Sequence, residues 1–463
     1  MIPERLRPLV EQTAELAGRF AAADRQLYLV GGVVRDAILD RLGEDGDLDF
    51  TTNATPDETE AILTGWAPAV WTQGKRFGTI GAHLPEPAGK VVEITTHRAD
   101  AYHPDSRKPD VEFSDAVEVD LSRRDFTVNA MALSLPELRL IDPYNGAADL
   151  AAGHLRTPRS PEESFSDDPL RMLRAARFIA GYGLVPDPAL EAAVVRLRGR
   201  LEIVSDERIR AELDKLVVVE RPGEGLWFLV RTGLAEEFLP ELPALGLEQD
   251  PIHRHKDVLA HTIAVIEKTS QDRILRLAAL FHDVGKPKTR SFGTRGAVSF
   301  HHHEVVGARM TRDRMRALRY SSDDTEDVTR LVELHLRFHT YQMGWTDAAV
   351  RRYVRDAGPL LAKLNELTRS DCTTRNAAKA RALARRMDEL EERIAELSER
   401  ESLAALRPDL DGRAVMDRLG VKPGPVVGKA LAFLMELRLE EGPLGEAEAG
   451  RRLDAWWAEQ QSA

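Results

Sequence analysis

The most constraining feature of the chain is a short segment near its N-terminus, Leu29-Val-Gly-Gly-Val-Val-Arg-Asp36. The apolar run at 27–30 predicts a strand, and Gly31 and Gly32 predict a turn whose backbone can approach a phosphate closely. Arg35 would then lie in the first turns of a helix, whose N-terminal N–H groups favour an anion. The segment therefore predicts a strand, a phosphate-binding turn and a helix.

Two acidic residues follow, Asp47 and Asp49. Side chains alternate across a strand, so both carboxylates would lie on one face, and they would repel unless a cation lay between them. Oxygen ligands shared with nucleotide phosphates suit Mg²⁺. Alone, a Gly-Gly turn is common and an Asp-x-Asp pair is usually just solvated. Together they predict a nucleotidyl-transfer site, with Asp47 and Asp49 as catalytic metal ligands.

The chain resembles class II tRNA nucleotidyltransferases and bacterial poly(A) polymerases, which are related to DNA polymerase beta. The resemblance covers about residues 25–230, and it implies an α+β head with a mixed sheet and helices, followed by a mostly all-α neck. After the opening segment, the matching motifs are Gly74–Thr79, Val92–Arg98, Arg123–Ala130, Ile141–Gly146, Asp167–Phe178 and Glu207–Leu213.

The resemblance implies attack of an RNA 3′-hydroxyl on the α-phosphate of CTP or ATP, a reaction that needs charge neutralisation and in-line positioning. Arg35 would bind triphosphate oxygens, since arginine matches phosphate geometry. Glu93 lies on a predicted strand and is a candidate third metal ligand, although it could equally be an ordinary polar strand position.

The family resemblance also places Arg124, Asp125 and Asn129 near the sugar and the triphosphate. Asp125 can accept a hydrogen bond from a 2′-hydroxyl, which would favour ribonucleotides. The alternative is that Arg124 and Asp125 simply form a salt bridge with each other.

Asp168 and Arg171 are the pair that the resemblance assigns to the incoming base. Asp168 suits the N-cap of a helix and Pro169 its first turn. A carboxylate can accept from the amino groups of cytosine and adenine, and arginine can donate to ring acceptors. The alternative is a capped helix with a solvated arginine. The family usually has Glu-Asp where this chain has Asp167-Asp168.

Three arginines of the predicted neck helix, Arg171, Arg174 and Arg177, would cover an arc of about 120°. We expect them to contact nucleotide and to form a strip that faces tRNA, with Arg196, Arg198 and Arg200 nearby. Solvated arginines are the alternative. The net charge of −12 argues against broad, non-specific affinity for nucleic acid.

Nine of the thirteen histidines lie between His253 and His339. The segments Lys256–Thr262, Leu277–Lys286, Phe300–Gly307, Leu334-His335 and Arg369–Asp371 resemble the HD superfamily of metal-dependent phosphohydrolases. The resemblance implies metal ligands at His261, His282, Asp283 and Asp371. It also implies a second metal or a phosphate at His303, His335 and Lys286. His253, His255, His301 and His302 are expected at the surface.

Imidazoles together with carboxylates suit a transition metal such as Mn, Ni or Co more than Ca. Any single buried histidine could instead be a satisfied core residue. An active site of this kind would hydrolyse phosphoesters with a metal-activated water, and related domains are associated with cleavage of 2′,3′-cyclic phosphates. We leave both the metal and the activity open at this point.

The predicted organisation has four parts: a head at 1–155, a neck at 156–240, an HD domain at 241–376 and a helical tail at 377–463. Segments 158–166, 223–225 and 240–251 are the expected connectors. Residues 378–401 predict an exposed charged helix, and 420–425 a turn between two tail helices.

Several features of the sequence indicate the cellular compartment in which we expect the protein. The single cysteine, Cys372, fits a reducing compartment, and no apolar run reaches the roughly 18 residues of a membrane span. With no apolar N-terminal run, a signal peptide is not expected. We expect a cytoplasmic protein without membrane contact, and its oligomeric state stays open.

The leading prediction is a CCA-adding tRNA nucleotidyltransferase that uses CTP and ATP. The polar segment 98–110 matches a flexible loop that the family links to the switch from C to A. The alternatives are a poly(A) polymerase, an A-adding or CC-adding enzyme, and an HD phosphohydrolase whose head only binds nucleotide or RNA.

Overall fold

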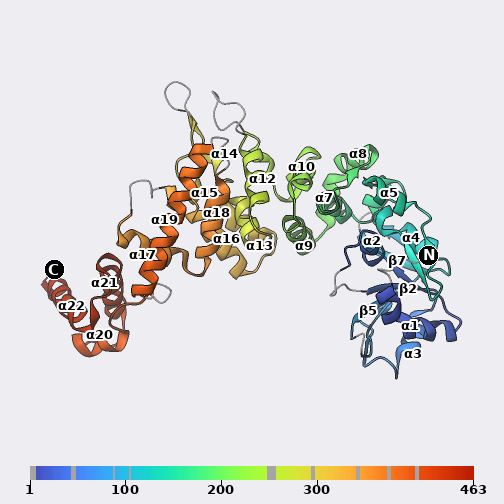
Figure 1. The fold of residues 1–463 in the computed structure, drawn as a ribbon, viewed down its shortest axis with the longest axis horizontal. Helices are drawn as coiled ribbons and strands as arrows, with labels where there is room; N and C mark the ends of the chain where they lie inside the picture. The colour runs from blue at the N-terminus through green and yellow to red at the C-terminus, as the bar shows by residue number, and fades with distance from the viewer. Residues whose placement is uncertain are drawn as a thin grey trace. The chain divides into compact units, whose positions relative to one another are not determined.

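The computed structural model describes residues 7–42, 48–86, 89–103, 106–247, 257–292, 298–339, 345–372, 377–401 and 406–462. The chain divides into two compact units, Met1–Pro243 and Ala244–Ala463. Figure 1 shows a sheet with helices near the N-terminus, whereas the later part of the chain is helical.

A seven-stranded mixed sheet forms the centre of the first unit, in the order β3-β4-β5-β2-β1-β8-β9. Strands β2 and β5 run parallel, and the other neighbours are antiparallel. The sheet confirms the predicted fold of the head. Its strands are β1 (Leu27–Val30), β2 (Leu48–Thr52), β3 (Ala69–Trp71), β4 (Thr79–His83), β5 (Val91–Thr96), β8 (Ala132–Leu135) and β9 (Leu140–Ile141).

The central strand β1 is buried at all four residues, which explains its uninterrupted apolar sequence. On one face, Tyr28 and Val30 pack with Val117 and Leu121 of α4. The helices of the head are α1 (Arg7–Ala22), α2 (Gly32–Ile38), α3 (Pro56–Leu63), α4 (Val117–Ser122) and α5 (Gly146–Ala152). The strand at 27–30 and the helix that follows the glycine turn are both confirmed.

The polar segment expected to be a flexible loop forms a β-hairpin instead. Strands β6 (Arg98–His103) and β7 (Ser106–Phe113) pair antiparallel, with an irregularity between Ala101 and His103. A two-stranded ribbon needs only backbone pairing between its strands, so a polar sequence is compatible with it. The expectation of a loop at 98–110 was therefore wrong in secondary structure, because these residues belong to paired strands.

A helical region follows the head. Segment 158–166, expected as a connector, contains most of α6, and 223–225 begins α10 instead of a linker. A Cβ at Gly225 would lie 2.4 Å from the Ala176 carbonyl oxygen, so this glycine allows close helix packing. The helices are α6 (Pro161–Asp167), α7 (Leu170–Tyr182), α8 (Pro188–Leu197), α9 (Asp206–Val217), α10 (Gly223–Arg231) and α11 (Leu234–Phe238).

The second unit begins with helices around a buried α13, in which every residue from Leu275 to Phe281 is buried. A two-stranded pairing of β12 (Ser291–Phe292) with β13 (Val298–Ser299) accompanies them. The helices are α12 (Val258–Lys268), α13 (Arg273–Phe281), α14 (Lys286–Thr289), α15 (His303–Ala317), α16 (Ser322–Leu334), α17 (Asp347–Ala357) and α18 (Leu361–Asp371).

The long helix α19 (Ala377–Glu401) is charged but not exposed all round, because Met387, Leu390, Ile394 and Leu397 are buried. Arg351 of α17 holds its end, donating to Glu401 at 2.7 and 2.8 Å. The remaining helices, α20 (Gly412–Leu419), α21 (Pro425–Glu441) and α22 (Gly445–Ser462), include the predicted helix–turn–helix. None of the helices in the described ranges is long and apolar enough to cross a membrane.

Candidate functional sites

The glycine turn brings together two predicted site residues from distant segments. Gly31 has a φ of 75° and α2 begins at Gly32. A Cβ at Gly31 would lie 3.0 Å from Nη1 of Arg124 and 4.0 Å from Oδ2 of Asp49. Glycine is therefore favoured by the positive φ of this residue, and the absence of a Cβ leaves room for the guanidinium that lies over the turn.

Two of the predicted carboxylates lie side by side on the sheet. The parallel register of β2 and β5 pairs Asp49 with Glu93, and both residues are exposed. Parallel neighbours in register point to the same face of a sheet, so their side chains can share a ligand. Asp47 falls within 43–47, outside the described residues, and its predicted pairing with Asp49 stays a prediction.

Arg35 is held inside the protein and is only 6% exposed. It donates to Asp36 at 2.8 and 2.9 Å and to the side-chain carbonyl of Asn129 at 2.5 Å. Its guanidinium also lies 4.2 Å from the ring centre of Tyr182. In this arrangement Arg35 orders the residues behind the turn, while Arg124 lies directly over it.

Asp125 accepts hydrogen bonds from the Phe126 N–H, from Asn129 and from Arg174. Burial alone would raise the pKa of Asp125, but the charge of Arg174 and these hydrogen bonds hold it well below its usual range. Arg124 pairs instead with Asp120. The alternative of a simple Arg124–Asp125 salt bridge is therefore wrong.

Asp168 and Arg171, the predicted base-reading residues, have separate partners. Asp168 accepts from Arg208 at 2.9 and 3.4 Å. Arg171 is 8% exposed and donates to Ser164 and to the backbone carbonyl of Arg123. The alternative of a solvated Arg171 is wrong, because this guanidinium is buried and bonded.

The start of α7 differs by one residue from the prediction. Asp168 closes α6, and Pro169 takes the N-cap position of α7. The Asp168 carboxylate nevertheless accepts from the Leu170 N–H at 3.2 Å, so it still caps the helix. The neighbouring Asp167 pairs with Arg159.

Arg174 and Arg177 do not form a free basic strip with Arg171. Both donate to the buried carboxylate of Glu212, Arg177 at 2.8 Å and Arg174 at 3.5 Å. Arg196 and Arg198 also pair with acids, and Arg200 donates to the Ser166 carbonyl. The helical spacing predicted the positions of these arginines around the helix, but it could not predict the acidic residues with which they pair.

A cluster of histidines and carboxylates lies in the second unit, where the ends of several helices meet. His261 comes from α12, His282 and Asp283 follow α13, and Asp371 ends α18. Nε2 of His261 lies 2.9 Å from Asp371 Oδ1, 3.3 Å from His282 Nε2 and 3.5 Å from Asp283 Oδ2. The four predicted ligands are thus brought together.

A second group shares Asp283 with the first. His303 begins α15 and His335 follows α16, and the ligand atoms of Asp283, His303 and His335 lie within 4.8 Å of one another. The atoms of His261, His282 and Asp283 meet the same limit. Asp283 therefore stands between two triads of ligand atoms.

Three of the histidines have a fixed ring orientation. Nδ1 of His282, His303 and His335 lies 2.7, 2.8 and 2.6 Å from the backbone carbonyl three residues earlier. A carbonyl can only accept, so Nδ1 carries the proton and Nε2 offers a lone pair. This arrangement of metal-binding histidines is common in proteins.

The electrostatics of the cluster favour a cation. Burial lowers the pKa of His335 to about 3, with the charge of His282 adding to the effect. Burial also opposes a charge on His282, but Asp283 and Asp371 raise its pKa overall. The two carboxylates thus draw positive charge into a site whose walls include a neutral imidazole.

Lys286 lies beside this cluster, with Nζ 2.6 Å from Asp283 Oδ2. His301 and His302 are exposed, as expected, and His253 and His255 lie outside the described residues. Sequence reasoning missed the pairing roles of Asp120, Arg208 and Glu212. Arg208 and Glu212 belong to the motif Glu207–Leu213, but their positions in the sequence do not indicate which residues they pair with.

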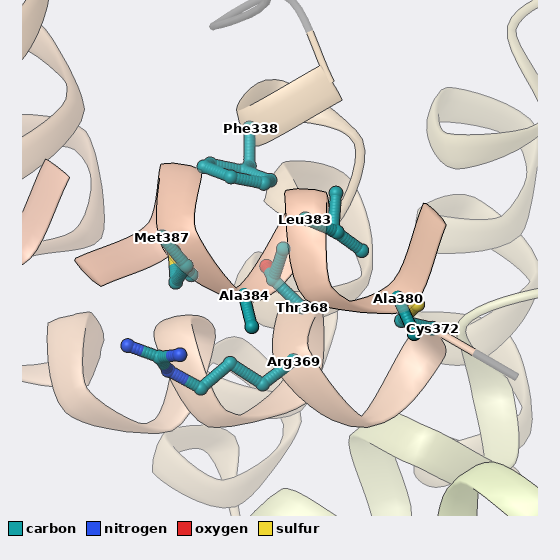
Figure 2. A pocket seen from close by; sticks show the side chains of 8 residues that line it. All are labelled: Phe338, Thr368, Arg369, Cys372, Ala380, Leu383, Ala384 and Met387. Atoms are coloured by element: carbon teal, nitrogen blue, oxygen red, sulfur yellow. The ribbon is translucent and has the colours of Figure 1, made fainter. Parts of the chain in front are cut away.

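A pocket of about 180 Å³ lies between α18, α19 and Phe338. Figure 2 shows Leu383, Ala384 and Met387 of α19 facing it. Thr368 donates to a backbone carbonyl, and Arg369 donates to Asp388 and Glu391. The pocket therefore offers mainly apolar contact, unlike the neighbouring histidine cluster.

Three family models match the chain. The Poly A polymerase head domain matches residues 27–156, the probable RNA- and SrmB-binding site of polymerase A matches 183–245, and the HD domain matches 258–402. The glycine turn and the histidine cluster thus fall within the first and last matches. Residues 168–177 lie between the first two matches, and Arg208 and Glu212 lie within the second.

The A-adding tRNA nucleotidyltransferase of Deinococcus radiodurans is 34% identical over 86% of this chain and 96% of its own length. The CCA-adding enzyme of Bacillus velezensis is 38% identical over 49% of this chain, which spans 54% of that enzyme. The structure is similar to the Bacillus stearothermophilus CCA-adding enzyme in complex with CTP, with a TM-score of 0.69, 21% identity and full coverage of both chains. The chain belongs to the family of class II tRNA nucleotidyltransferases and poly(A) polymerases with an HD domain, and it is a nucleotidyltransferase.

Proposed function

We propose that the chain appends C, C and A to the 3′ ends of tRNA from CTP and ATP. The observation that carries the proposal is the meeting of Gly31, Arg124 and Asp49 at the start of α2, with Glu93 opposite Asp49. Backbone N–H groups at a helix N-terminus and a guanidinium suit a triphosphate. Relatives named as CCA-adding enzymes support the choice of substrates.

The exposed, paired carboxylates of Asp49 and Glu93 fit a hard cation such as Mg²⁺, with Asp47 as a further ligand. Such an ion neutralises charge on the reacting phosphates. The protein's own part is to hold the triphosphate at the Gly31–Gly32 turn under Arg124. Arg35 is proposed to bind triphosphate oxygens. Through its hydrogen bond to Asn129 it also keeps Asp125 in place for the ribose.

Base choice is proposed to rest on Asp168 and Arg171. The carboxylate of Asp168 is held by Arg208 and caps α7, so it has a fixed place from which to accept an amino group of cytosine or adenine. Guanine and uracil present a carbonyl there, which a carboxylate cannot bind. Protein side chains, and not a nucleic-acid template, would thus select the incoming nucleotide.

Addition of A alone is the second candidate. It is favoured by one observation, since a relative whose length this chain covers to 96% is named as A-adding. The described hairpin β6–β7 keeps the segment that we link to the switch from C to A, and this supports full CCA addition.

The test uses Mg²⁺ and three tRNAs: one without the terminal CCA, one without the final A, and one complete. Each is supplied with CTP, ATP or both, and the products are sequenced. Addition of C, C and A followed by a stop is the expected result. Addition of A alone, or of long A tails, would contradict the proposal in favour of the alternatives.

We also propose that the histidine cluster binds divalent transition metal of the Mn, Ni or Co class and hydrolyses phosphoesters. Its donor set of imidazoles and carboxylates fits such ions. Within the described residues, Nε2 of His335 is buried and has no hydrogen-bond partner, as a metal ligand would require. His261, His282, Asp283 and Asp371 would hold one ion, and His303, His335 and Lys286 a second ion or a phosphate.

The substrate class proposed for this cluster is an RNA end with a 2′,3′-cyclic phosphate. Water would add to phosphorus while one ester bond to the ribose breaks, and the freed ribose oxygen takes the proton. Hydrolysis of such an end by the Mn²⁺-loaded chain, lost in Asp283→Asn, is expected. Equal hydrolysis by the variant would contradict the assignment.

The four-part division at 155, 240 and 376 and a cytoplasmic location remain proposals. The division is supported by family models that begin and end near the first two boundaries, although the HD model extends to residue 402. Limited proteolysis tests the boundaries, and cell fractionation tests the location.

A further inference from the structure

Asp120 is a fully buried carboxylate that no predicted role explains. It lies on α4 and has 0% exposure. Its Oδ1 accepts from Arg123 at 2.5 and 3.0 Å, and its Oδ2 accepts from Arg124 at 3.3 Å. Burial opposes its charge, but the two guanidinium groups hold its pKa below the ordinary value. A charge in the core is stable only with such partners.

The two arginines that Asp120 binds, Arg123 and Arg124, contact different parts of the proposed transfer site. The guanidinium of Arg124 lies over the glycine turn, 3.0 Å from where a Cβ of Gly31 would be. The backbone carbonyl of Arg123 accepts from Arg171 at 2.6 Å. One carboxylate therefore fixes a segment that touches both the triphosphate turn and the base-reading arginine.

We propose that Asp120 is a positioning residue for nucleotidyl transfer, acting through Arg124 and Arg123. Asp120 is fully buried and bonds to both arginines, so its effect is to hold the guanidinium of Arg124 beside the turn, within reach of a bound triphosphate. Preorganised charge of this kind lowers the barrier because it needs no rearrangement during the reaction. The inference rests on the proposed function of the head.

The test is a double-mutant cycle of Asp120→Asn and Arg124→Gln, measured as kcat and KM for CTP addition to tRNA. We expect each single variant to lower kcat/KM by about 10- to 100-fold. If Asp120 acts through Arg124, the double variant loses no more than about threefold beyond Arg124→Gln. Losses that multiply would overturn the inference, as would an Asp120→Asn enzyme as active as wild type.

Asp149→Asn is the matched control, because Asp149 is 4% exposed, also pairs with an arginine, Arg156, and accepts a hydrogen bond from Thr127. A similar fall in melting temperature with addition retained is expected for the control. Equal loss of addition in the control would overturn the inference, since any buried pair would then have the same effect.

If Asp120→Asn does not fold, Arg124→Lys tests the same link. An ammonium keeps the charge but cannot reach both Asp120 and the turn, so kcat should fall and KM for CTP should rise. Unchanged kinetics would overturn the inference. A wild-type chain that adds no nucleotide would overturn the proposed function as well, whereas multiplying losses in an active enzyme overturn only the role of Asp120.

Discussion

The nucleotidyltransferase head and the HD cluster differ in how their buried charged and polar groups are paired. In the head, the buried charged side chains neutralise one another, as Asp125 does with Arg174 and Asp120 with Arg124. In the HD cluster, ring orientations are fixed by backbone carbonyls, and Nε2 of His335 has no partner among the described residues. The head thus holds its binding groups by ion pairs, whereas the cluster has lone pairs that converge on one place.

The difference indicates what each site needs from outside. Ion-paired arginines stay ordered without substrate and present their remaining N–H groups to a phosphate. Converging histidine nitrogens and carboxylates gain stability from a bound cation, since a buried acceptor without a donor is unfavourable. We therefore expect the arginines of the head to stay in place without a ligand, whereas the histidine cluster should depend on bound metal.

The largest expected effect is on catalysis in the head. Asp49→Asn removes a carboxylate charge where the cation is proposed, and nucleotide addition should fall by about 1,000-fold, which is roughly 4 kcal/mol of barrier. The rate of CTP and ATP incorporation into tRNA measures this.

Asp57→Asn serves as its control, because Asp57 is an exposed residue of α3 that pairs with Lys75. The control should retain wild-type addition, and both variants should retain the metal content of the HD cluster. Full activity in Asp49→Asn would remove this residue from the proposed site.

A smaller effect is expected on base choice. Asp168→Ala should reduce discrimination against UTP and GTP by about 10- to 100-fold, since a good polar base contact contributes about 1–3 kcal/mol. Relative kcat/KM values for the four nucleotides measure it. The adjacent Asp167→Ala, which loses only a pair with Arg159, should leave selectivity intact. Unchanged selectivity in Asp168→Ala would mean that the base is recognised elsewhere.

A third effect concerns the stability of the head and its dependence on pH, and not its catalysis. The pKa of Asp125 lies below its ordinary value near 3.8, so its stabilising contribution is present above that pH and is lost as the pH falls below it. Asp125→Asn should be less stable at pH 7 by roughly 3 kcal/mol, the scale for breaking a buried pair. It should then lose less stability than wild type between pH 4 and 2.5.

Thermal unfolding of the full chain at each pH measures this difference. Parallel curves for the variant and the wild type would contradict the role given to the Asp125–Arg174 pair.

Local patterns predicted the elements that depend on neighbouring residues. The strand at 27–30, the turn at Gly31 and helix α2 follow from apolar burial and glycine geometry within one continuous segment, 27–38. The HD ligands were predicted from their motifs, and the structure brings them together. The family resemblance of these motifs, and not a calculation from the residues alone, therefore identified the candidate ligands.

Pairings between distant residues could not be predicted in this way. Arg208 is 40 residues from Asp168, and Arg174 is 49 residues from Asp125. Helical spacing showed which arginines share a face but not that Glu212 lies opposite them. The hairpin at β6–β7 was missed because polar composition resembles that of a loop, although backbone pairing determines a ribbon.

The most direct test of separate sites is to measure metal content and nucleotide addition on one sample of purified His282→Ala. His282 is fully buried and its Nε2 lies within the cluster. We predict that the variant loses the transition metal bound by wild type while it adds C, C and A at a rate within about twofold of wild type, because the head's groups are held by their own ion pairs. Retained metal, or addition that falls together with the metal, would contradict this account.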